Sequence, residues 1–597
     1  MAKRNVGRFL NEFRKTDSSE RKRTGNLAYV QLSGTMTENK VRFLSLRIIK
    51  FFRYISRLFS HASAKAYGMA AFSFGIVALL LYFLKLTADA SIQTPIVAAA
   101  VALVAIPFML ADKPVPMFLQ DFAVTDYIFF EFFCIKRFSK MESVYKIPLL
   151  IPILLGVACA CIGLIHPIWY VLIAVAALLF VCITLMSPEF ALFASFLALP
   201  YMQFIPYSSV LFITLIVLSV VSFARKSFFG KRVFYFDIYD VILAAFMLIV
   251  LISGIFVKGM SSFTSALCFF FVGFGYTLSN NVVTNRRLAD RAVNSIVISS
   301  LIPAIVAISD FVKTIIVGKA ADLIDTGVFF AFYERESFAV FMLVASVFAI
   351  AMFRQAHGVK KIFYAFALAI EFLALVLTGE MFAVLALLLG VAVFYIIRSG
   401  KGTIPMICVL ALVPYLALLL PKVALDSLFS VIPSLESAAE LFALWRASLS
   451  AFAKNIFIGI GVGADSFVAE MAETNISNLN SANIFIEVGL EAGLFALVCF
   501  VALIVVRLIH RASYYPYIKN SVVSTLAPIC SVCIFSLITY GSVSHIFADM
   551  YSCYIFWCVF GIGSATLRVA KRETDDRIHY YEDTRASDSS AIDVEIR

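Results

Sequence analysis

The stretch "IWYVLIAVAALLFVCITLM", Ile168–Met186, has 19 residues and no charged side chain. An α-helix rises about 1.5 Å per residue, so a helix of this length can cross the ~30 Å hydrocarbon core of a bilayer. Its apolar residues are continuous rather than alternating, which favours a helix over a strand of a membrane β-barrel. The stretch therefore predicts a transmembrane helix.

Similar runs recur along the chain of 597 residues, which is 62% hydrophobic and 15% charged, with a mean hydropathy of +0.94. We predict an all-α polytopic membrane protein with about 12–16 transmembrane helices. The apolar runs are 66–85, 92–111, 147–164, 168–186, 188–203, 207–224, 238–257, 263–280, 292–312, 336–353, 361–377, 380–397, 403–420, 484–506, 521–540 and 550–570.

The loops between these runs alternate in charge. Basic residues cluster at 136–140, 225–232, 286–291 and 507–519, which lie in every second loop. Because cytoplasmic loops carry an excess of Lys and Arg, we predict a multi-pass protein of the cytoplasmic membrane with both termini in the cytoplasm. The net charge of +11 is explained by this orientation and does not indicate nucleic-acid binding.

Three regions are predicted. Residues 1–65 form a basic cytoplasmic region, in which 41–59 mixes Arg and Lys with Phe, Ile and Leu. That pattern suits a helix lying on an anionic inner leaflet, and equally suits a basic flank with no specific lipid role. Residues 66–570 form the transmembrane domain, with a large outer loop at 421–483. Residues 571–597 are polar and acid-rich, which predicts a disordered cytoplasmic tail.

The sequence predicts no metal site and no cofactor. The 11 cysteines lie almost entirely in the apolar runs and are interpreted as small hydrophobic residues. Cys530 and Cys533 form a CxxC motif, but no second Cys or His pair lies nearby in the sequence. The stretch 459–467, "GIGVGADSF", lacks both the preceding strand and the lysine of a phosphate-binding loop, so it predicts a structural turn.

Two stretches carry a family resemblance. "ALWRASLSAFAKNIFIGIGVGADSF" (443–467), followed by "SANIFIEVGLEAGLFAL" (481–497), resembles the signature region of the O-antigen ligase/polymerase-like family. In that family a Trp-containing helix leads to a Gly-Val-Gly turn, a polar segment and a helix with Glu-x-Gly. The closing run 541–563 is similar in spacing to that of clostridial-type members. The resemblance covers most of residues 55–570.

The resemblance implies a metal-independent, class C-like membrane glycosyltransferase. Such proteins take a glycan from an undecaprenyl-pyrophosphate carrier at the outer face of the membrane and add it to a lipid or a growing glycan. The implied partners are a lipid-linked glycan donor, a glycan or lipid acceptor, and membrane lipids. This chemistry needs cationic donors for the pyrophosphate and a general base for the acceptor hydroxyl.

Three positions depart from the family pattern. Ala482 stands where a histidine base is expected, and Met381 and Leu441 stand where arginines are expected. The sequence therefore leaves two possibilities open. The protein either transfers the glycan with other residues or binds the lipid-linked glycan without transferring it.

Other residues at predicted outer ends are candidates to replace the missing groups. The candidate catalytic residues are Glu487 and His545. The candidate substrate-binding residues are Arg335, Arg446, Lys454, Asn483 and Glu491. Structural alternatives are a salt bridge at a helix mouth for Arg335, a solvated loop charge for Arg446, and a packed interfacial side chain for His545.

Glu487 and Glu491 lie four residues apart at the start of the run 484–506, which places both on one face of a helix. Asn480 or Ser481 is expected to cap this helix. The family pattern assigns Glu491 to a structural Glu-x-Gly position and leaves Glu487 as the more individual residue.

Glu371 lies inside the predicted run 361–377. Acids within a membrane span are costly and usually face a cavity or a partner. The residue either lines the same outward cavity as Glu380 or is protonated and packed between helices.

Two further function classes stay open. A lipid-linked oligosaccharide flippase or other transporter would need a polar cavity open to alternate sides, and usually an internal repeat, which the sequence does not show. A non-enzymatic membrane scaffold would recruit assembly enzymes through the basic N-terminal region.

Overall fold

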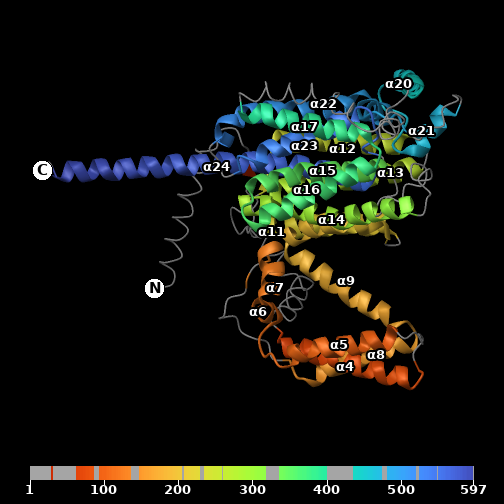
Figure 1. Ribbon diagram of the computed structural model, residues 1–597, viewed down its shortest axis with the longest axis vertical. Coiled ribbons are helices and arrows are strands. Elements are labelled where there is room, and N and C mark those ends of the chain that lie inside the picture. Colours follow the sequence, from red (N-terminus) through yellow and green to blue (C-terminus); the bar gives the residue numbers. More distant parts are fainter. Residues whose placement is uncertain are drawn as a thin grey trace, which may run out of the picture. The chain divides into compact units, whose positions relative to one another are not determined.

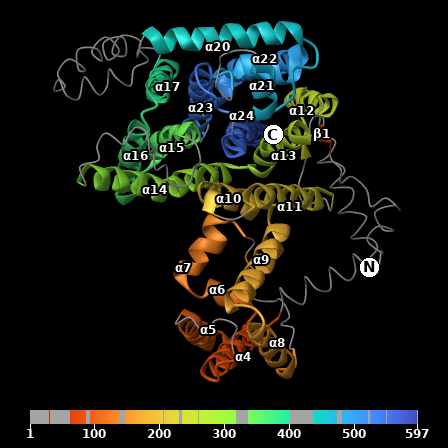
Figure 2. The same ribbon diagram turned by 90° about the vertical axis from the view of Figure 1, so that its right-hand side faces the viewer.

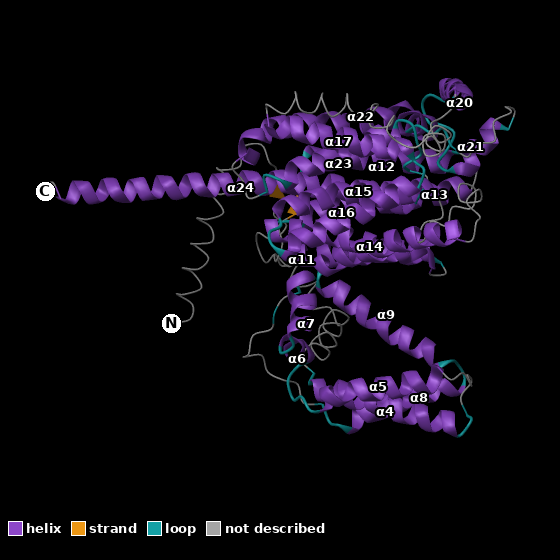
Figure 3. Cartoon of the chain, viewed as in Figure 1, coloured by secondary structure: helices purple, strands orange, loops and turns teal. Residues whose placement is uncertain are grey.

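The computed structural model describes residues 29–30, 62–86, 93–135, 137, 147–204, 207–228, 234–257, 260–316, 335–399, 435–472, 480–519, 523–547 and 549–595. Besides loops and turns, these residues form helices and one short antiparallel pairing of β1 (Tyr29–Val30) with β2 (Phe234–Tyr235) (Figure 3). Nine of the described helices are long and apolar enough to cross a membrane. The prediction of an all-α polytopic membrane protein is confirmed.

The predicted apolar runs coincide with helices wherever the structure describes them. The run 403–420 and the amphipathic stretch 41–59 lie outside the described residues. The described chain divides into two compact units, so the predicted domain 66–570 contributes to both.

One unit comprises residues 34–195 and 217–225. Its helices are α4 (Ala64–Phe83), α5 (Gln93–Met109), α6 (Val115–Gln120), α7 (Ala123–Thr125), η1 (Asp126–Phe132), α8 (Leu150–Cys161), η2 (Ile162–Leu164) and α9 (Ile168–Met186). Helix α4 packs against α5 and α8, around a buried cluster that includes Phe74, Ala98 and Ile168 (Figure 1). Small residues in this cluster let the helices approach closely, as is usual in membranes.

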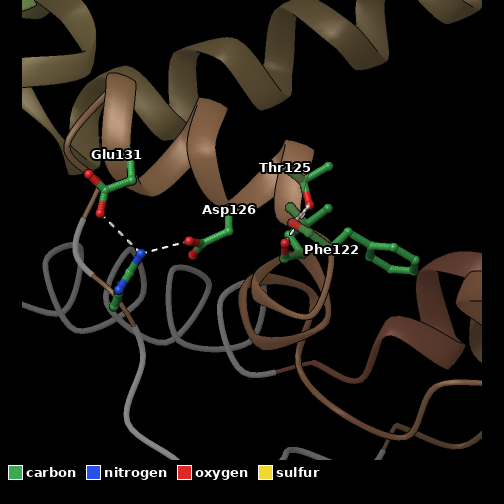
Figure 4. A network of polar contacts seen from close by, with 6 residues as sticks. Phe122, Thr125, Asp126 and Glu131 are labelled. Atoms are coloured by element: carbon green, nitrogen blue, oxygen red, sulfur yellow. Dashed lines mark hydrogen bonds and ion pairs between the residues drawn. The ribbon is translucent and has the colours of Figure 1, made fainter. Parts of the chain in front are cut away.

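In this unit Asp126 and Glu131 form ion pairs with Arg137, a basic residue of a predicted inner loop cluster. Arg137 Nη2 lies 2.6 Å from Asp126 Oδ2 and 3.2 Å from Glu131 Oε1 (Figure 4). Thr125 Oγ1 donates to the Phe122 carbonyl at 3.1 Å in the same turn. Because the Arg137 side chain is half exposed, these pairs fix the turn locally and add little stability.

The other unit comprises residues 1–33, 196–216 and 226–597. Its helices are α12 (Ile238–Phe256), α13 (Met260–Val282), α14 (Arg286–Ile316), α15 (Arg335–Gln355), α16 (Val359–Leu377), α17 (Met381–Ser399), α20 (Leu435–Lys454), α21 (Ala464–Met471), α22 (Ile484–Lys519), α23 (Leu526–Gly541) and α24 (Met550–Glu595). Helices α10 (Pro188–Ala198) and α11 (Ser208–Phe228) contribute residues to both units, and η3 (Leu199–Phe204) follows α10.

Within this second unit, α15 and α24 form the interior. The apolar part of α15 is 83% buried and that of α24 is 94% buried. Helix α13 packs along α24 and α16 packs along α15, while α12 contacts α13 and α22 (Figures 1 and 2). A helix that is apolar on all sides suits such a central position.

Helix α24 continues to Glu595, through residues 571–595 that the sequence predicts to be a disordered tail. No glycine or proline occurs between Ser564 and Arg597, so no residue of the helix-breaking kind ends the helix after the membrane span.

Candidate functional site

Helix α22 is broken where the sequence predicts one continuous span. Gly493 has φ 84° and ψ 177°, a conformation that only glycine adopts without strain. A Cβ atom at this position would lie 2.3 Å from the Phe457 carbonyl oxygen. The break frees backbone groups inside a helix that is long and apolar enough to cross a membrane, and these groups need partners from the protein.

The glycine-rich turn after α20 supplies those partners. Ile460 N donates to the Leu490 carbonyl at 2.8 Å, and Gly461 N donates to the Glu491 carbonyl at 3.1 Å. On the other side of the break, Leu494 N donates to the Ile456 carbonyl at 2.7 Å. The turn therefore docks on the broken helix, which gives it a structural role.

A cavity of ≈ 850 Å³ lies beside this break, where helix ends predicted to be extracytoplasmic meet. Among the described residues, the acidic ones that line it are Glu336, Glu380, Asp465, Glu487, Glu491 and Asp549, and the basic ones are Arg335 and His545. Its hydroxyl, amide and aromatic lining residues are Ser209, Ser261, Thr264, Ser265, Asn480, Phe269 and Phe547. All these residues belong to the second unit.

Glu487 and His545, the two candidate catalytic residues, meet in this cavity. His545 Nδ1 lies 2.6 Å from Glu487 Oε2, and the two side chains are only 9% and 6% exposed. Burial lowers the pKa of His545, but the Glu487 carboxylate, helped by Glu491 and Glu336, raises it more. The net effect raises the pKa of His545 above its usual value, which favours the imidazolium–carboxylate pair.

Glu491 lines the same cavity and also fixes the turn. Its Oε1 accepts a hydrogen bond from Gly463 N at 2.8 Å, and its carbonyl accepts one from Ser253 Oγ at 2.7 Å. One residue therefore ties α22 to α12 and to the turn that precedes α21. The structural role that the resemblance implies for Glu491 agrees with these contacts.

Arg335 begins α15 and lines the cavity. Its Nη1 lies 3.8 Å from Glu380 Oε1, and Tyr540 Oη donates to Glu380 Oε2 at 3.3 Å. Glu380 follows Thr378 in the turn between α16 and α17, where the family pattern places an arginine at the next residue. The Arg335 guanidinium in this cavity thus comes from α15, and not from position 381 at the start of α17.

Asn483 lies outside the cavity lining and caps α22. Its Oδ1 accepts from Phe485 N at 3.0 Å and from Ile486 N at 3.2 Å, and its Nδ2 donates to the Ser542 carbonyl at 2.8 Å. The prediction that Asn480 or Ser481 caps this helix is wrong. Asn483 is the residue directly before the helix, so its side chain reaches the free N–H groups of the first turn.

Ala482 packs against the apolar cluster of Leu444, Ile460 and Leu490 rather than into the cavity. Its φ of 49° is unusual for alanine, and Asn480 Oδ1 supports the turn by accepting from Ala482 N at 2.9 Å. The position where the family resemblance places a base therefore lies against an apolar cluster in this chain, outside the cavity lining.

Arg446 and Lys454 are exposed on α20 and do not line the cavity. Leu444 and Ala451 form the buried face of this helix. Glu371 is fully buried, lies outside the cavity lining and accepts a hydrogen bond from Ser300 Oγ at 2.6 Å. Of the two possibilities for Glu371, the structure shows packing between α14 and α16.

The sequence offered no role for Asp465 and Asp549. Asp465 follows the glycine-rich turn, where Ser261 Oγ donates to its carboxylate. Asp549 precedes α24 and accepts from Ser552 N at 3.3 Å. Asp465 is in the first turn of α21 and Asp549 lies in the loop before α24, both at predicted outer ends, but only the tertiary structure brings them to one cavity. In the described part of the chain, no three His, Cys, Asp or Glu residues are grouped as metal ligands.

The described chain is thus a polytopic helical membrane protein with an acid-rich cavity beside a broken helix. Residues 364–501 match the family model of the O-antigen ligases. This match confirms the resemblance to the O-antigen ligase/polymerase-like family and supports a role in polysaccharide assembly. No curated protein matches the chain. The matched segment contains Glu380, Glu487 and Glu491, whereas Arg335 and His545 lie outside it.

Proposed function

We propose that this protein transfers a glycan from undecaprenyl pyrophosphate to a lipid or glycan acceptor at the outer face of the cytoplasmic membrane. The observation that carries this proposal is the buried Glu487–His545 contact in the cavity beside the broken helix. The match of residues 364–501 to O-antigen ligases supports the reaction class.

His545 is the proposed general base. Its Nδ1 lies 2.6 Å from Glu487 Oε2, so Nε2 is the proposed atom that takes the proton of the acceptor hydroxyl. The acceptor oxygen then bonds to the anomeric carbon, and the bond from that carbon to the pyrophosphate oxygen breaks. The pyrophosphate carrier leaves with the bonding electrons.

Glu487 and Arg335 support this reaction in different ways. Glu487 orients the imidazole and stabilises the imidazolium that forms when the proton moves. Arg335 is the proposed contact to the departing pyrophosphate, because a guanidinium pairs well with phosphate oxygens. Arg446 and Lys454, exposed on α20, are proposed to contact phosphates at the rim rather than inside the cavity.

A transfer assay tests this function. Purified full-length protein is incubated with an undecaprenyl-pyrophosphate glycan and an acceptor, and the product is followed by mass spectrometry. His545→Ala is expected to lower the rate by roughly 10²–10⁴-fold, as loss of a general base usually does. Glu470→Gln is the control, because Glu470 lies on α21 outside the cavity lining. Full activity of both His545→Ala and Glu487→Gln would overturn the proposal.

A second candidate function is glycan binding without transfer. Among the described lining residues, the basic groups are Arg335 and His545, and each contacts a carboxylate. Because their charge is already partly balanced, they would stabilise a leaving pyrophosphate less well, which favours binding over transfer. This candidate predicts that the unmodified protein binds the lipid-linked glycan but forms no product in the same assay. Efficient transfer would exclude it.

A further inference from the structure

Tyr540 is a fully buried residue near the end of α23, and its hydroxyl group contacts a side chain of another element. Tyr540 Oη donates to Glu380 Oε2 at 3.3 Å, and Glu380 Oε1 lies 3.8 Å from Arg335 Nη1. Arg335 and Glu380 line the cavity, whereas Tyr540 lies outside its lining. Tyr540 therefore acts on the cavity through the Glu380 carboxylate.

The backbone of Glu380 is restrained as well. Glu380 N donates to Thr378 Oγ1 at 3.1 Å, and Thr378 Oγ1 in turn donates to the Leu375 carbonyl at 2.6 Å. The Glu380 carbonyl accepts from Ala383 N at 3.0 Å in the first turn of α17. The Glu380 side chain is thus held at its backbone by the turn between α16 and α17, and at its tip by Tyr540.

The segment that follows Tyr540 carries the proposed base. Helix α23 ends one residue after Tyr540, and His545 follows four residues later. The Ser542 carbonyl accepts from Asn483 Nδ2 at 2.8 Å, which ties this segment to the start of α22. One short stretch, 540–545, therefore carries both the imidazole and the hydroxyl group that contacts the Arg335–Glu380 pair.

From these contacts we propose that Tyr540 is a positioning residue, which acts through Glu380 to hold the Arg335 guanidinium where the pyrophosphate of the donor binds. This inference rests on the proposed function, because it assigns the residues that support the proposed phosphate contact. A long arginine side chain loses rotamer freedom when it binds a phosphate, and one that is already held in place loses less. Affinity for the pyrophosphate should therefore depend on a hydroxyl group that does not itself touch it.

Binding of the carrier tests the inference without requiring transfer. The probe is undecaprenyl pyrophosphate, and undecaprenol is the matched probe, because it has the same lipid chain without the phosphates. Full-length protein in nanodiscs of zwitterionic lipid is titrated with each probe, and binding is measured by displacement of radiolabelled undecaprenyl pyrophosphate. Empty nanodiscs give the blank, because both probes partition into lipid.

Tyr540→Phe removes only the hydroxyl group and is expected to weaken binding of undecaprenyl pyrophosphate by roughly 3–10-fold, the usual effect of one hydrogen bond. Arg335→Ala should weaken it by roughly 10–100-fold, because a hydrogen bond to a charged group is lost. Tyr364→Phe is the matched control, since it also removes a buried hydroxyl group, one that donates to Asn294 at 2.8 Å outside the cavity lining. Its affinity should be unchanged.

The double variant Tyr540→Phe with Arg335→Ala separates positioning from a general structural role. If Tyr540 acts through Arg335, the hydroxyl group has nothing left to position, so the double variant should bind within about twofold of Arg335→Ala. If Tyr540 only stabilises the fold, the two losses should multiply. Multiplied losses, or unchanged affinity of either single variant, would overturn the inference and leave the proposed function standing.

Two further measurements complete the test. Thr378→Val removes the acceptor of Glu380 N and should also weaken binding of undecaprenyl pyrophosphate, so it replaces Tyr540→Phe if that variant does not fold. Unchanged binding by Thr378→Val would then overturn the inference. If the unmodified protein binds undecaprenyl pyrophosphate no better than undecaprenol, the proposed function falls and the inference falls with it.

Discussion

At the scale of single residues, His545 shows how a buried site sets the state of a titratable group. Burial favours the neutral imidazole, whereas the Glu487 carboxylate at 2.6 Å favours the imidazolium, and the carboxylate prevails. The raised pKa of His545 has a direct consequence for the proposed reaction, because a general base must be neutral before it accepts a proton.

We therefore expect the transfer rate to rise with pH, through a midpoint above the usual histidine value of about 6.5. Glu487→Gln removes the charge that raises the pKa of His545, so its midpoint should lie at lower pH, in addition to a lower maximal rate. Rates measured between about pH 5 and pH 9 at saturating substrate check this. A midpoint that does not move in Glu487→Gln would argue against His545 as the base.

At the scale of elements, the broken helix α22 carries the site. Its first part holds Glu487 and Glu491, and the break at Gly493 receives the turn that leads to α21. The turn is held at several points, by backbone hydrogen bonds and by the Glu491 carboxylate. The glycine-rich turn and helix α22, which are separated in the sequence, thus both depend on the backbone conformation of Gly493.

Gly493→Ala is expected to destabilise the protein by at least about 1–3 kcal/mol, because alanine would be strained at this φ and ψ. Its Cβ would also lie 2.3 Å from the Phe457 carbonyl oxygen. Gly489→Ala is the matched control in the same helix, since its nearest neighbour would be 3.4 Å away. Thermal unfolding of both variants in the same detergent checks the difference, and equal melting temperatures would contradict the argument.

At the scale of the whole molecule, the charge of the loops predicts which ends of the helices face the cytoplasm. The cavity lies at the opposite ends of these helices, which the same rule predicts to face outward. The described chain forms two compact units, and the cavity lies within the one that contains the ligase-like segment.

Cysteine labelling checks this orientation. A membrane-impermeant maleimide added to intact cells should label Lys454→Cys, which is exposed on α20 at the predicted outer face. Lys360→Cys, exposed beside the start of α16 at the predicted inner face, should be labelled only after the membrane is opened. The unmodified protein gives the background from native cysteines. The reverse pattern would invert the predicted topology.

The sequence by itself determined the helical membrane architecture, because continuous apolar runs must satisfy their backbone hydrogen bonds internally in lipid. It also pointed to the ligase-like segment and to Glu487 and His545 as candidates. Only the tertiary structure decided that these two residues meet, that Asp465 and Asp549 join them, and that Arg446 and Lys454 lie elsewhere. The reason is physical: hydrophobicity is a local property of the chain, whereas the charge of a cavity depends on contacts between distant loops and on a helix break at one glycine.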